Sequence, residues 1–424
     1  MKRAAPAVVL SASLLAAAAT AGPWEPPPVA VSRETFEVSY PKATVSAAVL
    51  TLETLSAALG NDMSPEDPER PHPTAEAANA VRSSISALSS WLRHELEEPG
   101  DKVGASGPGV AEFLTANAST IDKIVSLVAG NQEIAWDLDV ARGIDAPLPN
   151  LLGVTRLQRI LAAQALLDIR NGDPYEALTI VDGMWRICEA LAARPELITQ
   201  VIALQQARYA EGILRKVSAP AYGWSERLRE EGLYHALLAA LQNDPWISAT
   251  DPNRAEHAAI RARVSRRFVD GLIAESACGW SREAIAHEWE VAGSGEGALE
   301  EDITAMASDE IVDMLLRSNR FLLDSEMTAL VVEARIDKAA DRDGRWPEKL
   351  PNLESSVCPG RFYTYRRAGG ANLDFPGAVP RGDRDSLALP MSFRGAPTPT
   401  PTPTPTQPRP VLTPTPPAHR LLGR

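Results

Sequence analysis

The sequence lacks long hydrophobic segments, which limits how it can relate to a membrane. Only residues 7–19 form an apolar run, broken by two serines, whereas a transmembrane helix needs about 20 apolar residues. Lys2 and Arg3 precede the run and Ala19-Thr20-Ala21 follows it, a pattern typical of a secretory signal peptide. We therefore expect residues 1–21 to be removed, leaving an exported protein, periplasmic or extracellular, that does not span a membrane.

Cysteine is also scarce. The chain has three cysteines, so at least one thiol stays unpaired in an oxidising compartment. Cys188 falls on the apolar face of a predicted helix, where a thiol behaves as a small hydrophobic group. Cys278 and Cys358 lie in the turn-like sequences ESACGW and SSVCPG. We predict a disulfide between Cys278 and Cys358 that attaches the C-terminal segment to the helical body.

Basic residues are too few to balance the acidic ones. Lysine and arginine total 42 against 55 aspartates and glutamates, and loss of the two basic residues of the signal peptide changes the net charge from -13 to -15. So acidic a chain repels a phosphate backbone. One basic cluster is present, at Arg261, Arg263, Arg266 and Arg267. We interpret it as a solvated helix face and expect no nucleic-acid partner.

Motifs for catalysis and cofactor binding are missing as well. The chain has no G-x-S-x-G, Walker A, G-x-G-x-x-G or H-E-x-x-H motif. His94 and Glu98 share one predicted helix face, and Glu283, His287 and Glu290 share another. Each group offers too few ligands for a zinc site. We predict no catalytic, cofactor-binding or metal-binding residues.

The central stretch, residues 151–217, has the most regular helical pattern of the chain. Its apolar spacing predicts three consecutive helices, at 157–169, 174–192 and 196–217. Gly172 supplies the left-handed residue that ends the first helix, and Asp173 with Pro174 supplies the N-cap and first residue of the second. The sequence therefore predicts a capped helical hairpin at the centre of the fold.

Other helices surround this centre. Long helices are predicted at 43–59, 75–97, 110–128 and 309–340. Asp before Pro at 244 and at 251 predicts two further helix starts, and Ser225 and Ser281 are predicted N-caps. Short strands are predicted within FYTYRR, LDF and residues 386–393.

These patterns predict a mainly α fold, an irregular antiparallel bundle of helical hairpins with a small C-terminal β-containing appendage. The predicted divisions are a signal peptide (1–21), a Pro-rich extended linker (22–42), a helical domain (43–340), a β-containing segment (341–395) and a tail (396–424). The tail alternates proline with threonine and has little apolar content, so it is expected to be disordered.

Three parts of the sequence resemble segments of known protein families. The sequence NGDPYEAL (171–178) resembles the turn of a tetratricopeptide repeat, but it does not recur every 34 residues as in an array. The run 147–204, with ARIDKAADRDGRWPEKL and the Cys-Pro and Tyr-x-Tyr that follow, resembles an uncharacterised family of exported bacterial α-helical proteins with no assigned activity. The order of helix, D-G-x-W-P-x-x-L and short strands also resembles the C-terminal segment of type II secretion pseudopilins.

For function, the sequence favours an exported, non-enzymatic scaffold or binding protein of the cell envelope, with a protein or an envelope component as its partner. One alternative is a hydrolase of envelope polymers that uses the helix-borne glutamates and His287 in acid/base catalysis. A second alternative is an accessory protein of a secretion or pilus system.

Overall fold

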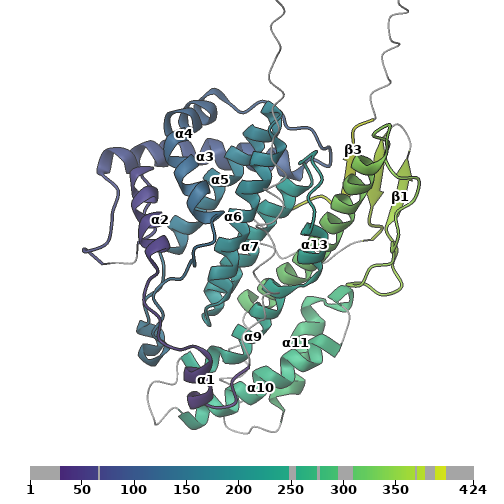
Figure 1. The fold of residues 1–424 in the computed structure, drawn as a ribbon. Helices are drawn as coiled ribbons and strands as arrows, with labels where there is room; N and C mark the ends of the chain where they lie inside the picture. The colour runs from purple at the N-terminus through teal and green to yellow at the C-terminus, as the bar shows by residue number, and fades with distance from the viewer. Residues whose placement is uncertain are drawn as a thin grey trace, which may run out of the picture.

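The computed structural model describes residues 29–64, 67–247, 255–274, 277–294, 309–367, 370–377 and 387–397. Within them the chain is mostly helical, with one small antiparallel sheet near its C-terminal end (Figure 1). The predicted fold class, mainly α with a small β-containing segment, is confirmed. The predicted signal peptide and most of the predicted tail lie outside the described residues.

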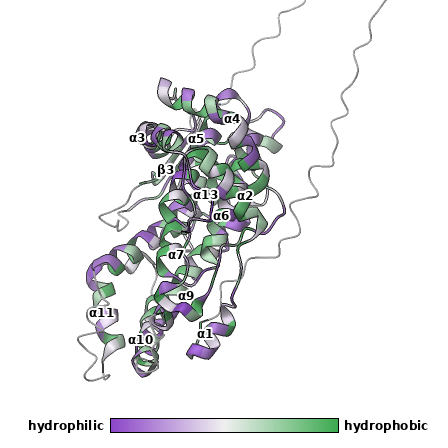
Figure 2. Ribbon diagram, turned by 90° about the vertical axis from the view of Figure 1, so that its left-hand side faces the viewer, coloured by the Kyte–Doolittle hydropathy of each residue, from purple (hydrophilic) through white to green (hydrophobic). Residues whose placement is uncertain are grey.

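The first part of the chain forms the upper body in Figure 1. Its helices are α2 (Ala47–Ala58), α3 (Ala75–Glu97), α4 (Pro108–Val128), α5 (Leu151–Asn171), α6 (Pro174–Ala192) and α7 (Leu197–Leu214). The 3-10 helix η2 (Val140–Asp145), between α4 and α5 in the sequence, lies lower in the view. The three central helices pack against one another, and α3 and α4 cover them. Hydrophobic and hydrophilic residues alternate along these helices (Figure 2), as expected where one face is buried.

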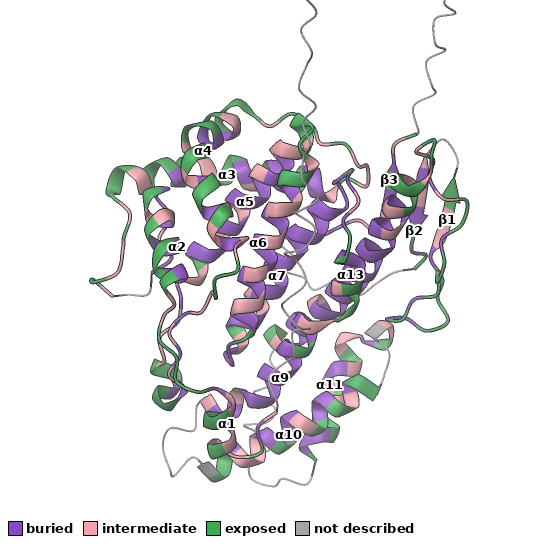
Figure 3. Ribbon diagram, in the orientation of Figure 1, coloured by how far each residue is buried: buried purple, intermediate pink, exposed green. Residues whose placement is uncertain are grey.

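The rest of the chain lies below this body and to its right in Figure 1. Its helices are α8 (Trp224–Arg229), α9 (Gly232–Ile247), α10 (Ala255–Ala274), the 3-10 helix η4 (Ala277–Gly279), α11 (Arg282–Gly293) and α13 (Asp309–Ala340). The last of these, α13, packs against α7, α8 and α11. Both α7 and α13 are buried along most of their length (Figure 3). None of the described helices is long and apolar enough to cross a membrane.

The central hairpin forms as the sequence predicts. Gly172 ends α5 with φ at 92°, in the left-handed region, and Pro174 begins α6 after Asp173. The first helix starts earlier than its apolar pattern indicates, because the Asn150 side chain accepts a hydrogen bond from the amide of Gly153 at 3.1 Å. Gly153 also lies against the backbone of the loop after α2, where an added Cβ would come 1.7 Å from the Asp62 carbonyl oxygen.

The small sheet closes on the end of α13. Its strands, β1 (Thr364–Arg367), β2 (Ala371–Asp374) and β3 (Ser392–Gly395), pair antiparallel in that order. Trp346 and Phe393 meet edge to face, and the cationic groups of Lys338 and Arg335 on α13 lie over their rings. The apolar residues of this segment belong to the same hydrophobic core as the helices.

A buried carboxylate joins this segment to the middle of α13. Glu326 accepts hydrogen bonds from the hydroxyls of Ser355 (2.6 Å), Ser356 (2.8 Å) and Tyr363 (2.9 Å), and from the Ser356 amide (2.6 Å). Four donors satisfy a charge that would otherwise be costly to bury. The 354–363 segment is therefore held to α13 by polar contacts as well as by packing.

The segment 22–42, predicted as an extended linker, instead contains helix α1 (Arg33–Ser39). Ser32 caps it by accepting from the Thr35 amide at 3.1 Å, and Phe36 is fully buried. Phe36 and Tyr40 lie one turn apart and are part of a second hydrophobic cluster with Trp246. The helix is too short to produce a periodic sequence pattern, which is why the prediction was wrong here.

Two of the predicted helix starts are also wrong. α9 continues through Pro245 to Ile247 instead of giving way to a new helix after Asp244. Proline is tolerated so near the helix end because only the Leu241 carbonyl loses its amide partner. α8 begins at Trp224 with Gly223 as N-cap, so Ser225 is not the cap. Ser281 does cap α11, and the predicted start at 251 lies outside the described residues.

Cys278 and Cys358 form a disulfide, with Cα atoms 5.4 Å apart, that ties η4 to the C-terminal segment. Cys188 is free and fully buried on α6, and burial raises the pKa of its thiol. We expect non-reducing peptide mapping of the protein to recover the 278–358 linked peptides. Cys188 should be alkylated only after denaturation; a labelled Cys278 or Cys358 in the native protein would contradict the pairing.

The contact at Gly153 gives a test of the packing between α5 and the loop after α2. Gly153→Ala should lower the free energy of unfolding by about 1–3 kcal/mol, because the methyl group collides with backbone that cannot move aside cheaply. Gly109→Ala on α4 is the matched control, since its Cβ meets nothing within 4 Å. Equal unfolding free energies for the two variants in urea would contradict this packing.

Candidate functional site

The residues of the hydrolase hypothesis do not converge. Glu283, His287 and Glu290 are exposed on α11, and His94 and Glu98 are exposed at the end of α3. Among the described residues there is no group of three or more histidine, cysteine or acidic side chains that could hold a metal ion. These side chains are exposed, and none of them lines the pocket described below.

The basic cluster on α10 does not form a single surface. Arg263 and Arg267 are exposed, whereas Arg261 and Arg266 are half-buried. The guanidinium of Arg266 donates to the Ala30 carbonyl at 3.3 Å, so this residue holds the chain before α1. The four arginines therefore lie in different environments, as expected from their spread around the helix.

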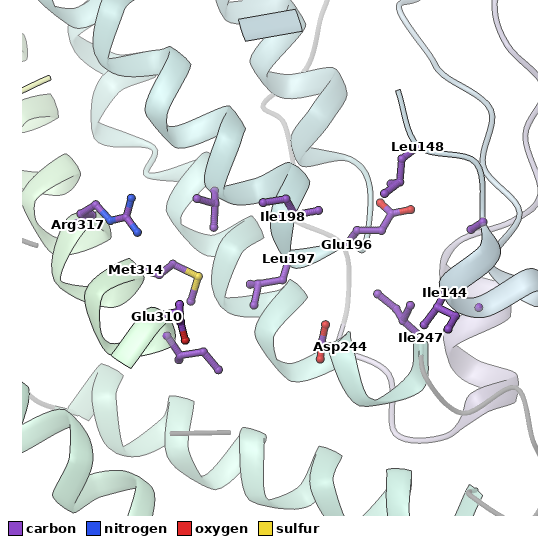
Figure 4. Close-up of a pocket in the computed structure, with 14 residues that line it drawn as sticks. Ile144, Leu148, Glu196, Leu197, Ile198, Asp244, Ile247, Glu310, Met314 and Arg317 are labelled. Atoms are coloured by element: carbon purple, nitrogen blue, oxygen red, sulfur yellow. The ribbon is translucent and has the colours of Figure 1, made fainter. Parts of the chain in front are cut away.

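A pocket of about 500 Å³ opens where η2, the start of α7, the end of α9 and the start of α13 meet (Figure 4). Its lining is largely aliphatic, with side chains from all four elements: Ile144, Leu148, Ile198, Val201, Ile247 and Met314. Ile144 is 77% exposed and Ile198 is 49% exposed. These isoleucines leave an apolar rim open to water, a feature typical of an interaction site.

The pocket exists because the molecule has two hydrophobic clusters that do not merge. Leu197, Val201 and Met314 belong to the main core, whereas Ile247 packs on the second cluster around Trp246. The pocket lies between these two sets of residues. No side chain of the described residues fills the space between the two clusters.

Arg194 fixes one wall of the pocket. Its guanidinium binds both carboxylate oxygens of Glu196, at 3.0 and 2.7 Å. The same group donates to the carbonyls of Asp137 (2.6 Å) and Pro147 (2.8 Å), which precede and follow η2. A planar guanidinium can serve several acceptors at once, so one buried side chain holds the η2 segment to the start of α7.

Arg33 holds η2 from another direction and joins it to the end of α9. From α1 it donates to the Val140 carbonyl of η2 at 2.7 Å and to the Trp246 carbonyl near the end of α9. The helix that replaces the predicted linker therefore braces two elements that line the pocket. This role could not be read from the sequence, because the partners are backbone carbonyls more than 100 residues away.

Three carboxylates and one guanidinium line the pocket. Glu196 is occupied by Arg194, and Arg317 is paired with Asp313 at 3.2 Å. Asp244 lies between Leu197 and Ile247 (Figure 4). Burial raises the pKa of Asp244, although the nearby charge of Arg261 acts in the opposite direction.

A buried ion network lies beyond the pocket, and the two are linked by a small cavity lined by Met314, Arg317 and Arg208. Arg208 on α7 binds Asp324 on α13 at 3.0 Å. Arg320 binds the same carboxylate at 3.2 Å, and Arg215 donates to it at 3.4 Å. Burial alone would raise the pKa of Asp324, but the three guanidiniums outweigh it and lower the pKa.

Glu211 is the acidic member of this network that is not stabilised as an anion. Burial, and next the charge of Asp324, raise the pKa of Glu211 to about 8. The Ser325 hydroxyl donates to one of its carboxyl oxygens, and the other, Oε2, has no hydrogen-bond partner. At neutral pH the carboxyl group is therefore mostly protonated. The network is sealed from solvent and joins α7 to α13, so its role is structural.

The side chains that line the pocket are better suited to binding an apolar ligand than to acid/base or nucleophilic catalysis. The residues that form it include no histidine, serine, cysteine or tyrosine, and its acids are separated by aliphatic side chains. Comparisons with protein-family models, with curated proteins and with solved structures gave no match, so geometry alone supports the choice of site.

Sequence reasoning missed the pocket residues. Asp244 entered only as a helix cap, and Ile144 and Ile198 have the pattern of ordinary core residues. The one sequence feature that could have indicated the site was Asp244-Pro245, an Asp followed by Pro at the end of a long apolar run. It was not specific, because the same pair at 173 and 174 starts a helix.

The raised pKa of Glu211 predicts how stability depends on pH. The folded state holds a proton that the unfolded chain has lost, so the free energy of unfolding falls as pH rises from about 5 to about 8. Glu211→Gln, which mimics the protonated form, should reduce this fall by about 1–3 kcal/mol in urea unfolding. The exposed Glu112→Gln should keep the wild-type slope; an unchanged slope in Glu211→Gln would contradict the assignment.

Proposed function

We propose that this chain is an exported, non-enzymatic binding protein of the cell envelope, and that it holds the apolar part of an envelope component in the pocket between η2, α7, α9 and α13. The observation that supports this most is the exposed aliphatic lining around Ile144 and Ile198. Exposed isoleucines at the mouth of a preformed cavity gain free energy when a ligand covers them, up to about 1.5–3 kcal/mol for a fully buried side chain.

The size of the pocket supports a small ligand or one chain of a larger amphiphile. Ligand pockets typically have volumes of about 300–1,000 Å³ and a mainly apolar lining with a few polar groups. The volume of about 500 Å³ falls in that range. Because Arg194 and Arg33 hold the walls in place, little conformational freedom is lost when a ligand binds.

The other two functions have less support. Hydrolysis of an envelope polymer needs an acid and a base that face one bound substrate. Glu283, His287 and Glu290 are exposed on one helix and do not line the pocket. No contact or surface of the described residues favours an accessory role in secretion. Export itself is proposed from the signal-peptide pattern of residues 1–21.

A charge at the mouth of the pocket tests the proposal. Ile198→Asp should weaken binding of the neutral apolar dye N-phenyl-1-naphthylamine by about tenfold or more, because the carboxylate must lose its hydration when the dye enters. Binding is measured by fluorescence titration of the mature protein.

Leu152→Asp is the matched control. Leu152 is 68% exposed and is the second residue of α5, as Ile198 is the second residue of α7. It does not line the pocket, so its substitution should leave dye affinity unchanged. Equal effects of the two substitutions, or no saturable binding by the unmodified protein, would contradict the proposed function.

A further inference from the structure

We propose that the pocket selects amphiphilic amines, with the ammonium group paired to Asp244 and the hydrocarbon chain lying against the aliphatic lining. This inference rests on the proposed function and adds the chemistry of the ligand's polar group. It is carried by the position of one carboxylate among the apolar side chains of the pocket.

Two of the charged side chains that line the pocket already form ion pairs within the protein. Glu196 is bound by Arg194, and Arg317 is bound by Asp313. Asp244 remains, and among the described residues its carboxylate makes no hydrogen bond or ion pair. Glu310, at the other end of the pocket beside Met314, is exposed and adds a second negative charge.

Asp244 is placed to meet a ligand. It lies between Leu197 and Ile247, where it lines the pocket together with them (Figure 4). Burial raises the pKa of Asp244, although the charge of Arg261 acts in the opposite direction. The carboxylate has therefore lost hydration without gaining a hydrogen bond from any described residue. A bound ammonium group would replace that hydration with a charge-assisted hydrogen bond, whereas a ligand carboxylate would be repelled.

The pocket suits a small molecule better than a folded partner. A stable protein–protein interface buries about 800 Å² on each partner, far more than the surface of one pocket of this size. The ligand must also be apolar over most of its length, because aliphatic side chains form most of the lining. A primary amine on an alkyl chain meets both conditions, and the acidic chain as a whole attracts cations.

Three ligands with the same alkyl chain separate this inference from the proposed function. Octylamine, 1-octanol and octanoate are titrated into the mature full-length protein by calorimetry at neutral pH, below their aggregation limits. Octylamine should bind about tenfold or more tightly than 1-octanol, and octanoate should bind weakest. Equal affinity of the amine and the alcohol would overturn the amine inference while the proposed function stands. No binding of any of the three would overturn both.

Asp244→Asn identifies the residue responsible. The substitution keeps the shape of the side chain and removes its charge, so it should abolish the preference for octylamine and leave 1-octanol affinity within about twofold. Asp122→Asn, at an exposed position on α4 outside the pocket, is the control and should keep the full preference. A preference that survives in Asp244→Asn would overturn the assignment to Asp244. Binding of 1-octanol by that variant shows that the pocket is still folded.

Discussion

The carboxylate of Asp324 is the contact on which the arrangement of the helices depends. It lies at the middle of α13 and is surrounded by Arg320 of the same helix, Arg208 of α7 and Arg215, the C-cap of α7. Arg215 also donates to the Pro390 carbonyl at 2.7 Å and to the Thr328 hydroxyl at 2.8 Å. Removing one member of a buried ion pair typically costs about 3–5 kcal/mol, because the other charge is left without a partner. The network therefore allows one register of α7, α13 and the C-terminal segment.

That register decides where the pocket can be. α7 and α13 contact each other at the ion network, and their N-terminal ends both reach the pocket, where Ile198 and Met314 form part of its lining. The opposite side is set by η2 and α9, which Arg33 and Arg194 hold through backbone carbonyls. The half-buried Arg33 and the buried Arg194 thus hold η2 and α9, and the arginines of the ion network hold α7 to α13. The aliphatic surface between them stays open because no side chain of either hydrophobic cluster extends across it.

The distribution of charge divides the molecule into parts with different roles. The buried acids Asp324 and Glu211 are ion-paired and mostly protonated, respectively, and they specify packing. Charges on α11 and at the end of α3 face solvent and contact no pocket. Asp244 belongs to neither group, since it is half-buried and lines an open cavity. For that reason we consider the pocket, and not the histidine-containing helices, to be the functional site.

The sequence by itself determined the local structure. Asp173, Pro174 and Gly172 set the central hairpin, and the predicted bounds of α3 and α13 match the structure, because caps and helical periodicity act within a few residues. It could not determine α1, which is stabilised by Trp246 and Val140 from distant parts of the chain. The pocket is likewise a product of tertiary structure. Ile198 and Asp244 become site residues only because two hydrophobic clusters close separately, and a space left between clusters has no pattern in a linear sequence.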